Sequence, residues 1–336
     1  MTIYDISKKA GVSIATVSRV LNGSDKVRPA TRQKVMDIIE KYDYAPNAFA
    51  RGMGLHSLKT IGILCADSSD LFLAKAVYHL EQELQENGYE SILCCTGYNR
   101  DIKESYMNLI LSKKVDSIIL VGSNFIGSTE DENQYIKDVS TQVPIMLLSA
   151  SFDYPNVYST LCDDYGTMFE ATTEMIQAGI TDILYLYDSK SYSGLKKLHG
   201  FRDAMKEHNI PGFEKLIHFY DGNIEHLDEI ADFVAGIAKK GASFHGIMTS
   251  DDSLAIGSIK YAQKKGIRIP EDLSVMGYNN SMLTNCCTPE LTSVDNRLET
   301  QTHQLVQTLL GVLAGEEMPK KSIFSGKIIK RGTTLF

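Results

Sequence analysis

From residue 61 onward, short apolar runs alternate with longer amphipathic segments, and this alternation constrains the fold more than any other feature of the chain. Strands are expected at 61–65, 91–95, 117–121, 145–148, 183–187, 246–249 and 273–277, and helices at 73–87, 163–179, 195–209, 224–240 and 252–266. Such alternation is typical of helices that cover the faces of a parallel sheet. Two α/β units fit this region, with a division near residue 160.

Polar side chains follow several of the expected strands. They are Asp67, Ser68, Ser69 and Asp70, then Ser149 and Ser151, then Asp251 and Asp252, and finally Asn279 and Asn280. Open parallel sheets bind ligands at the carboxyl ends of their strands. Carboxylates, amides and hydroxyls suit a polyhydroxylated ligand, with Phe72 or Tyr278 offering an apolar face. Taken alone, Asp67, Asp163 or Ser250 could instead cap a helix.

The first sixty residues follow a different pattern. Apolar residues recur at helical spacing over 3–10, and Gly11 is placed to end that helix. Ser13 is a suitable N-cap for a second helix over 14–22. Two short helices joined by a tight turn form a helix-turn-helix, whose second helix would enter the major groove of DNA. Pro29 is expected to open a third helix, over 29–42, that covers the other two.

Charge is distributed unevenly between these two regions. Residues 1–60 hold ten Lys and Arg residues against five acidic ones, which gives a net charge of +5. Because the whole chain has a net charge of −8, the remainder carries −13. A basic head on an acidic body can attract a polyanion locally while the body stays soluble.

The amino-terminal stretches resemble the headpiece of the lactose/galactose repressor family. The resemblance rests on YDISKKAGVS at 4–13, ATVSRVLNG at 15–23 and YAPNAFAR at 44–51. It implies that Arg19 reaches a guanine edge in the major groove and that Ile14 and Ala15 contact thymine methyl groups. The resemblance also implies that Tyr4, Ser13, Thr16 and Asn22 contact the DNA backbone and so set the register of the headpiece on the DNA.

The same resemblance implies a hinge helix that enters the minor groove, and its expected DNA contacts include Asn47, Ala50 and Arg51. Met53 occupies the position of the apolar wedge that kinks the duplex. The flanking Gly52 and Gly54 each lower helix propensity by about 1 kcal/mol, so the hinge is expected to fold only with DNA and the body present.

The body resembles the effector-binding part of the same family over essentially the rest of the chain. The implied fold is a small all-α helix-turn-helix headpiece (1–45), a hinge helix and linker (46–60), and a two-lobed α/β body with parallel sheets, like a periplasmic binding protein (61–336). The N-lobe is expected at about 61–158 and 289–319, and the C-lobe at about 159–288 and 320–336. Three chain crossings would join them. The expected effector-binding residues are Asp67, Ser69, Phe72, Ser149, Asp163, Lys197, Asp251 and Asn279.

Two departures from the family concern the ligand. Lys197 stands where an Arg is common, and Asn279 where an Asp is common, so a plain aldohexose is less strongly indicated. An acidic or phosphorylated sugar, or a protein co-effector, stays open.

Several other classes of protein lack their required motifs. No G-x-G-x-x-G follows an expected strand, and no P-loop or G-x-S-x-G elbow is present, so we expect no enzyme and no cofactor. The six Cys residues show no zinc spacing and are expected to be reduced thiols, with no metal site. Neither a signal peptide nor a run of about 18 apolar residues is evident, so we expect a cytoplasmic protein without a membrane segment.

The sequence therefore predicts a transcriptional regulator, most simply a repressor of carbohydrate-related genes that a sugar or sugar derivative controls allosterically. One recognition helix buries too little surface for specific binding, so a homodimer on a pseudo-palindromic operator is expected. The alternative is a sugar-binding protein of a transport system, which would have no use for the basic head.

Overall fold

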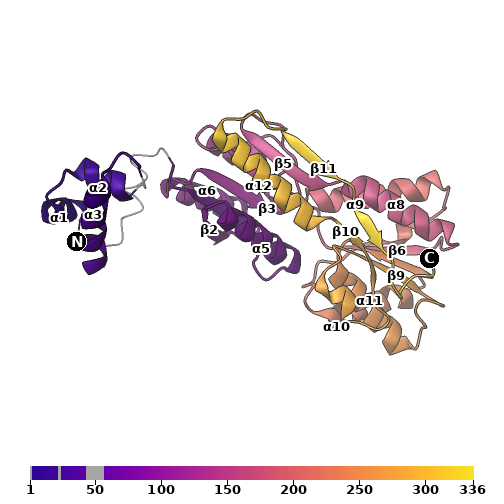
Figure 1. Ribbon diagram of the computed structural model, residues 1–336. Coiled ribbons are helices and arrows are strands. Elements are labelled where there is room, and N and C mark those ends of the chain that lie inside the picture. The colour runs from indigo at the N-terminus through magenta and orange to yellow at the C-terminus, as the bar shows by residue number, and fades with distance from the viewer. Residues whose placement is uncertain (1, 22–23, 43–56) are drawn as a thin grey trace.

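The computed structural model of the chain describes residues 2–21, 24–42 and 57–336. Three helices form the amino-terminal headpiece: α1 (Ile3–Ala10), α2 (Ile14–Leu21) and α3 (Pro29–Lys41) (Figure 1). Gly11 ends α1 in a left-handed conformation with φ of 62°, which costs a glycine little. Ile6, Ala10, Val17, Val20 and Val35 form the buried core of this small bundle.

Residues 57–336 form two lobes, each built on a six-stranded sheet. The N-lobe sheet has the order β11-β5-β4-β3-β1-β2, and its strands are all parallel. Its strands are β1 (Thr60–Cys65), β2 (Glu90–Cys95), β3 (Ser117–Val121), β4 (Ile145–Leu148), β5 (Val157–Cys162) and β11 (Lys321–Phe324).

Helices cover both faces of the N-lobe sheet (Figure 1). α5 (Leu71–Glu86) and α12 (Leu298–Ala314) pack together on one face, and α6 (Arg100–Ser112) and α7 (Gln134–Ser140) cover the other. The strands alternate between the two cores: in β1, Ile61 and Ile63 face α5 and α12, whereas Leu64 faces α6. Because both faces are buried, these strands are continuous apolar runs.

The C-lobe repeats this design. Its sheet has the order β12-β10-β9-β8-β6-β7, in which only the edge strand β12 is antiparallel. Its strands are β6 (Ile183–Tyr187), β7 (Ile217–Phe219), β8 (Gly246–Thr249), β9 (Ser274–Tyr278), β10 (Thr292–Asp295) and β12 (Lys327–Ile329). Its helices are α8 (Asp164–Gln177) and α9 (Tyr192–Glu207) on one face, and α10 (Leu227–Lys239) and α11 (Asp252–Lys265) on the other.

The chain crosses between the lobes three times, after β5, after β10 and after β11. The predicted lobe boundaries at 158, 288 and 319 are each too early. Val157–Cys162 pairs with β4 and Lys321–Phe324 pairs with β5, both in the N-lobe, whereas Thr292–Asp295 pairs with β9 in the C-lobe. In each case the last strand before the crossing still pairs within the lobe that the chain leaves, so the boundary falls after that strand.

The predicted linker boundary at 60 is also late. The Ser57 hydroxyl and the Thr60 backbone N–H both donate to the carboxylate of Asp116, each at 3.0 Å, so the body already includes residue 57. Four short 3₁₀ segments complete the described body: η1 (Ser123–Phe125), η2 (Asp131–Asn133), η3 (Phe213–Leu216) and η4 (Met282–Asn285). Within the described residues, no helix is long and apolar enough to cross a membrane.

Candidate functional site

The second headpiece helix presents a surface suited to a DNA groove. The Ser13 hydroxyl accepts from the Thr16 backbone N–H at 3.1 Å and lies 2.9 Å from the Thr16 hydroxyl, which caps the start of α2. Val17 and Val20 turn inward, and Ile14, Ala15 and Arg19 are exposed. The inward residues fix the helix on the bundle, so the exposed ones form a rigid reading surface.

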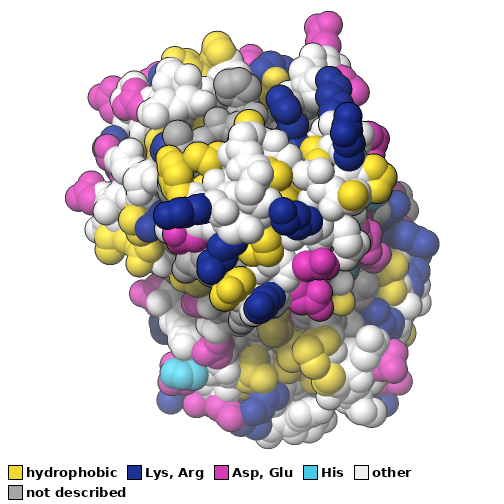
Figure 2. All heavy atoms as spheres, turned by 60° about the vertical axis from the view of Figure 1, so that its left-hand side comes forward, with side chains coloured by type: hydrophobic (Ala, Val, Ile, Leu, Met, Phe, Trp, Pro, Cys, Tyr) yellow, Lys and Arg dark blue, Asp and Glu magenta, His cyan; other side chains and the backbone are white. Residues whose placement is uncertain are grey.

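Tyr4, on the first headpiece helix, is also exposed. When the headpiece side of the molecule is turned forward, Lys and Arg side chains are spread over the near face (Figure 2). Such a face can bind phosphates while α2 contacts bases. Asn22, Asn47, Ala50, Arg51 and Met53 lie outside the described residues, so their DNA contacts stay predictions.

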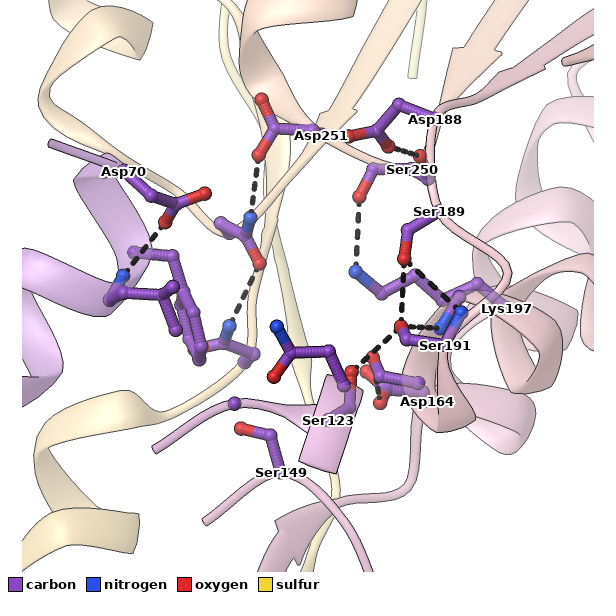
Figure 3. A pocket seen from close by; sticks show the side chains of 18 of the residues that line it. Asp70, Ser123, Ser149, Asp164, Asp188, Ser189, Ser191, Lys197, Ser250 and Asp251 are labelled. Carbon is purple, nitrogen blue, oxygen red and sulfur yellow. Dashed lines mark hydrogen bonds between the residues drawn. The ribbon is translucent and has the colours of Figure 1, made fainter. Parts of the chain in front are cut away.

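A cleft lies between the two lobes at the carboxyl ends of their strands. Its inner chamber has a volume of about 150 Å³ and is lined by side chains of both lobes (Figure 3). It adjoins a wider outer hollow of about 530 Å³, and Phe72 and Asn279 line both. The inner chamber can hold a single six-membered ring, and the outer hollow leaves room for a substituent.

Most of the predicted effector-binding residues lie in this cleft. The inner chamber is lined by Phe72, Ser149, Lys197, Asp251 and Asn279, and the outer hollow by Asp67 and Ser69. Asp67 also accepts hydrogen bonds from the backbone N–H and hydroxyl of Ser69, each at 2.8 Å, which shapes the loop after β1.

Asp163 is the exception, because it does not line the cleft. Its carboxylate accepts from the Gly166 backbone N–H at 3.0 Å as the N-cap of α8, and its side chain is exposed outside the cleft. The neighbouring Asp164 is buried and lines the inner chamber instead. Asp164 accepts from the Tyr278 and Ser193 hydroxyls, each at 2.6 Å.

Sequence reasoning also missed several residues of the inner chamber. Asp188 directly follows β6 and accepts from the Ser250 hydroxyl at 2.8 Å. The rule that identified Asp251 after β8 could have identified Asp188, because both stand where a parallel strand ends. Asn296 and Gln301 come from the second crossing between lobes, which no local pattern indicates.

Two of the predicted residues have unusual backbone conformations. Ser149 after β4 has φ of 68°, and Asn279 after β9 has φ of 98°. Left-handed backbone is uncommon for residues other than glycine and clusters at binding sites, where packing holds it in place. Both residues lie at strand ends that border the inner chamber.

A chain of amide hydrogen bonds forms one wall of the cleft. Asn279 donates to Asp251 at 2.9 Å and accepts from Asn296 at 3.0 Å, while Asp251 also accepts from the Ser253 backbone N–H at 2.7 Å. Asp251 is thereby fixed as the N-cap of α11. The wall is held before any ligand arrives, which reduces the entropy that binding would cost.

Burial dominates the acidity of the carboxyl groups in the cleft. Burial and, after it, the carboxylates of Asp188 and Asp252 raise the pKa of Asp251 to about 7. Burial likewise raises the pKa values of Asp70 and Asp164, which line the cleft, above their usual values, and it raises the pKa of Asp252, which lies behind the cleft wall next to Asp251, to about 6. Perturbed groups gathered in one cleft are typical of a binding site.

Several buried polar atoms of this region have no partner within the described residues. They include the side-chain oxygens of Asn124, Asn296 and Gln301, three residues that line the inner chamber. A buried acceptor without a donor costs about 1–3 kcal/mol, so these residues carry a polar cost of burial next to the cleft.

Among the described residues, no group of three or more His, Cys, Asp or Glu side chains is placed to hold a metal ion. All six Cys side chains are described, and they are free thiols.

Two family models match the chain. The model described as bacterial regulatory proteins of the lacI family matches residues 2–47, and that of a periplasmic binding protein-like domain matches residues 172–334. An HTH-type transcriptional regulator of Lachnoclostridium phytofermentans is 49% identical over 336 residues, all of both chains. The chain belongs to the lacI family of bacterial regulatory proteins. Catabolite control protein A of Priestia megaterium is 32% identical over 88% of this chain and 87% of its own.

Solved structures share the fold of this lacI-family chain. The lac repressor dimer bound to operator and an anti-inducer matches with a TM-score of 0.88 and 21% identity, over 100% of this chain and 99% of that one. The transcriptional regulator CelR in complex with cellobiose matches with a TM-score of 0.70 and 22% identity, over 99% of each chain. The predicted headpiece and two-lobed α/β body are thus confirmed.

Family membership decides between the two functions that the sequence left open. The chain is a DNA-binding transcriptional regulator, because both the headpiece and the full-length relative are of that kind. The other function, that of a sugar-binding protein of a transport system, is not supported, because the headpiece matches regulatory proteins.

Proposed function

We propose that this lacI-family regulator is a homodimeric repressor that binds a pseudo-palindromic operator and whose affinity for it is controlled by a sugar-class effector in the interlobe cleft. The observation that carries the proposal is the inner chamber of the cleft, which both lobes line with carboxyl, amide and hydroxyl groups. A polyhydroxylated molecule can donate to and accept from such groups.

The shape of the cleft also supports a sugar. Phe72 offers an apolar face beside carboxylates, amides and hydroxyls, which is the mixture that a pyranose ring requires. An acidic or phosphorylated sugar is disfavoured, because Lys197 is the only cationic side chain among the described residues that line the inner chamber. Its ammonium already donates to the Ser250 carbonyl oxygen at 3.0 Å.

The proposed dimer follows from the size of the headpiece. The exposed residues of one α2 helix that are suited to base edges are Ile14, Ala15 and Arg19, too small a surface for specific binding by one headpiece. Two headpieces related by a two-fold axis would read two half-sites. A lac repressor structure of the same fold is described as a dimer on operator, which supports this arrangement.

A mobility-shift titration tests the proposal. Purified full-length protein is titrated on DNA from upstream of its own gene, at fixed salt, with and without each member of a carbohydrate panel. We expect a specific complex of dimer stoichiometry whose affinity at least one carbohydrate changes by about fivefold or more. A complex that no carbohydrate changes, or one of monomer stoichiometry with unchanged affinity for a half-site, would contradict it.

A further inference from the structure

Two cysteine side chains face each other at the end of the N-lobe sheet. Cys65 is the last residue of β1 and Cys95 the last residue of the edge strand β2, and the two are direct partners in the parallel register. Their Sγ atoms lie 3.8 Å apart. Because side chains alternate between the two faces along each strand, directly paired residues project to the same face. The register of the strands itself therefore brings the two thiols together.

The backbone around this pair is suited to a disulfide bond. Neighbouring strands lie about 4.8 Å apart, within the range of Cα separations that a disulfide bridges, about 4.4–6.8 Å. Beyond the pair, the Thr96 backbone N–H donates to the Cys65 carbonyl oxygen at 2.9 Å. The Gly97 backbone N–H donates to the Ala66 carbonyl oxygen at the same distance, so the strands stay joined past the thiols. Bringing the sulfur atoms to the bonded distance of about 2.05 Å thus requires side-chain rotation and little movement of the strands.

The two thiols differ in their access to solvent. Cys65 is buried in the core under α5 and α12, whereas Cys95 is exposed on the edge strand. Burial and, after it, the neighbouring Cys95 raise the pKa of Cys65 to about 12, which keeps the Cys65 thiol protonated. An exposed thiol that can meet an oxidant, beside a buried thiol that cannot, is the arrangement of a reacting and a resolving cysteine.

We propose that Cys65 and Cys95 form a reversible disulfide bond, a redox modification site beside the interlobe cleft that responds to a peroxide. The Cys95 thiolate takes one oxygen from hydrogen peroxide, which breaks the O–O bond, forms a sulfenic acid and releases hydroxide. The Cys65 sulfur then bonds to the Cys95 sulfur, and the sulfenic hydroxyl leaves with the Cys65 proton as water. The two thiols together lose two electrons, and the peroxide, with both thiol protons, becomes two molecules of water. A thiol reductant reverses the modification by thiol–disulfide exchange.

The bond acts on segments that carry cleft residues. Asp67 and Phe72 follow Cys65 in the chain, Tyr98 follows Cys95, and all three line the outer hollow. β2 lies at the edge of the sheet and is held to it through β1, so local opening can separate β2 from the sheet. A covalent link at the carboxyl end of β2 prevents that opening and fixes this part of the cleft wall. The inference is independent of which ligand the cleft takes.

The first test is peptide mapping of the full-length protein. Reduced protein is treated with hydrogen peroxide, its remaining thiols are blocked with iodoacetamide, and it is digested with trypsin without reduction. Trypsin places Cys65 in the peptide 60–75, and Cys94 and Cys95 in the peptide 76–100. We expect mass spectrometry to find these two peptides joined within one chain, and dithiothreitol to separate them. A link between the 76–100 peptides of two chains, or a sulfinic acid on Cys95 without any link, would overturn the proposal.

Alanine variants identify the sulfur atoms of the bond. Cys65→Ala and Cys95→Ala should each abolish the joined peptides. Cys94→Ala is the matched control, because Cys94 adjoins Cys95 in β2 but packs against the opposite face of the sheet, and this variant should form the bond as fully as the wild type. Joined peptides in Cys95→Ala, or their loss in Cys94→Ala, would overturn the assignment. Since Cys95 is exposed, the Cys95→Ala result stands even where Cys65→Ala disturbs the core.

Hydrogen exchange measures the effect of the bond on the cleft wall. The backbone amides of 90–98 should exchange about tenfold more slowly in the oxidised wild type than in the reduced protein, because the link suppresses opening of β2. The amides of β7, the corresponding edge strand of the C-lobe sheet, are the internal control and should exchange equally in both states. Equal exchange of 90–98 in the two states would overturn the role of the bond at the cleft.

Discussion

The Ser123 hydroxyl donates to the Ser191 hydroxyl at 2.8 Å, and this hydrogen bond joins the two lobes across the wall of the cleft. Ser123 lies on η1 of the N-lobe, whereas Ser191 is the N-cap of α9 in the C-lobe. The lobes are therefore in contact around the inner chamber. Because the bond spans the cleft, any rotation that opens the lobes breaks it, which makes it a probe of closure.

Ser123→Ala should favour the open arrangement of the lobes. Loss of one hydrogen bond of about 0.5–1.5 kcal/mol should weaken effector binding about 2- to 10-fold, measured by calorimetry. Small-angle X-ray scattering of the effector-free variant distinguishes opening from a lost ligand contact, since only opening enlarges the radius of gyration. Ser191→Ala should show the same opening and lose about 1 kcal/mol of stability besides, because Ser191 also caps α9. A Ser123→Ala protein with unchanged affinity and radius would contradict the closure role.

Arg19→Ala should cost about 1–3 kcal/mol of operator affinity and relax specificity at one position in each half-site. The exposed guanidinium on α2 suits a bidentate contact with guanine. Arg19→Lys, which keeps the charge but loses the fork, should show the same relaxed specificity. Binding to a library of operator variants measures both effects. A uniform loss on all sequences would instead identify Arg19 as a phosphate contact.

Asp251→Asn should change the pH dependence of stability. The pKa of Asp251 in the folded protein is about 7, and an unfolded Asp titrates at about 3.9. Between these values the folded state binds more protons, so this group lowers the free energy of unfolding as the pH rises from about 4 to about 7. The Asn side chain of the variant does not titrate, so the free energy of unfolding of the variant does not fall in this way as the pH rises. The melting temperature of the variant should therefore exceed that of the wild type by a few degrees at about pH 8 and by less at about pH 5.

The exposed Asp163 supplies the control for that measurement. Asp163→Asn also replaces an N-cap carboxylate with an amide, but one that lies in solvent. Its melting temperature relative to the wild type should be the same at both pH values. If the difference between Asp251→Asn and the wild type were also independent of pH, the buried carboxylate would not be the group responsible.

The sequence predicted those parts of the fold that local patterns determine. The apolar runs of β1, β3, β4 and β6 were found at their observed places because both faces of each strand are buried. β5 was missed because Ser159 and Thr160 interrupt its apolar pattern. The short edge strands β11 and β12 contain charged residues and are recognisable only by their pairing partners.

The candidate site was predictable to the extent that it lies at strand ends. Ser149, Asp251 and Asn279 follow strands and do line the inner chamber. Asn296 and Gln301 could not be predicted, since the crossing after β10 brings them to the cleft, and that crossing depends on which sheet each strand joins. Asp163 and Asp164 were indistinguishable in sequence, and only the start of α8 decides which one faces solvent.

Met53→Ala tests the predicted hinge, which lies outside the described residues. If Met53 is the wedge in the minor groove, its truncation should weaken operator binding and reduce the influence of the effector on it, while effector binding to the free protein stays the same. Met36→Ala, a truncation of an exposed Met on α3, is the matched control and should keep the full response. A full effector response in the Met53→Ala protein would show that coupling takes another route.

The central claim is that a ligand in the interlobe cleft and operator DNA at the headpiece are coupled. The most direct measurement is the affinity of the effector for the dimer with and without saturating operator, together with the affinity of the operator with and without saturating effector. We predict that the two ratios are equal and differ from one by about 5- to 150-fold, the usual range of allosteric coupling. An effector that binds the cleft, with both ratios equal to one, would contradict the claim.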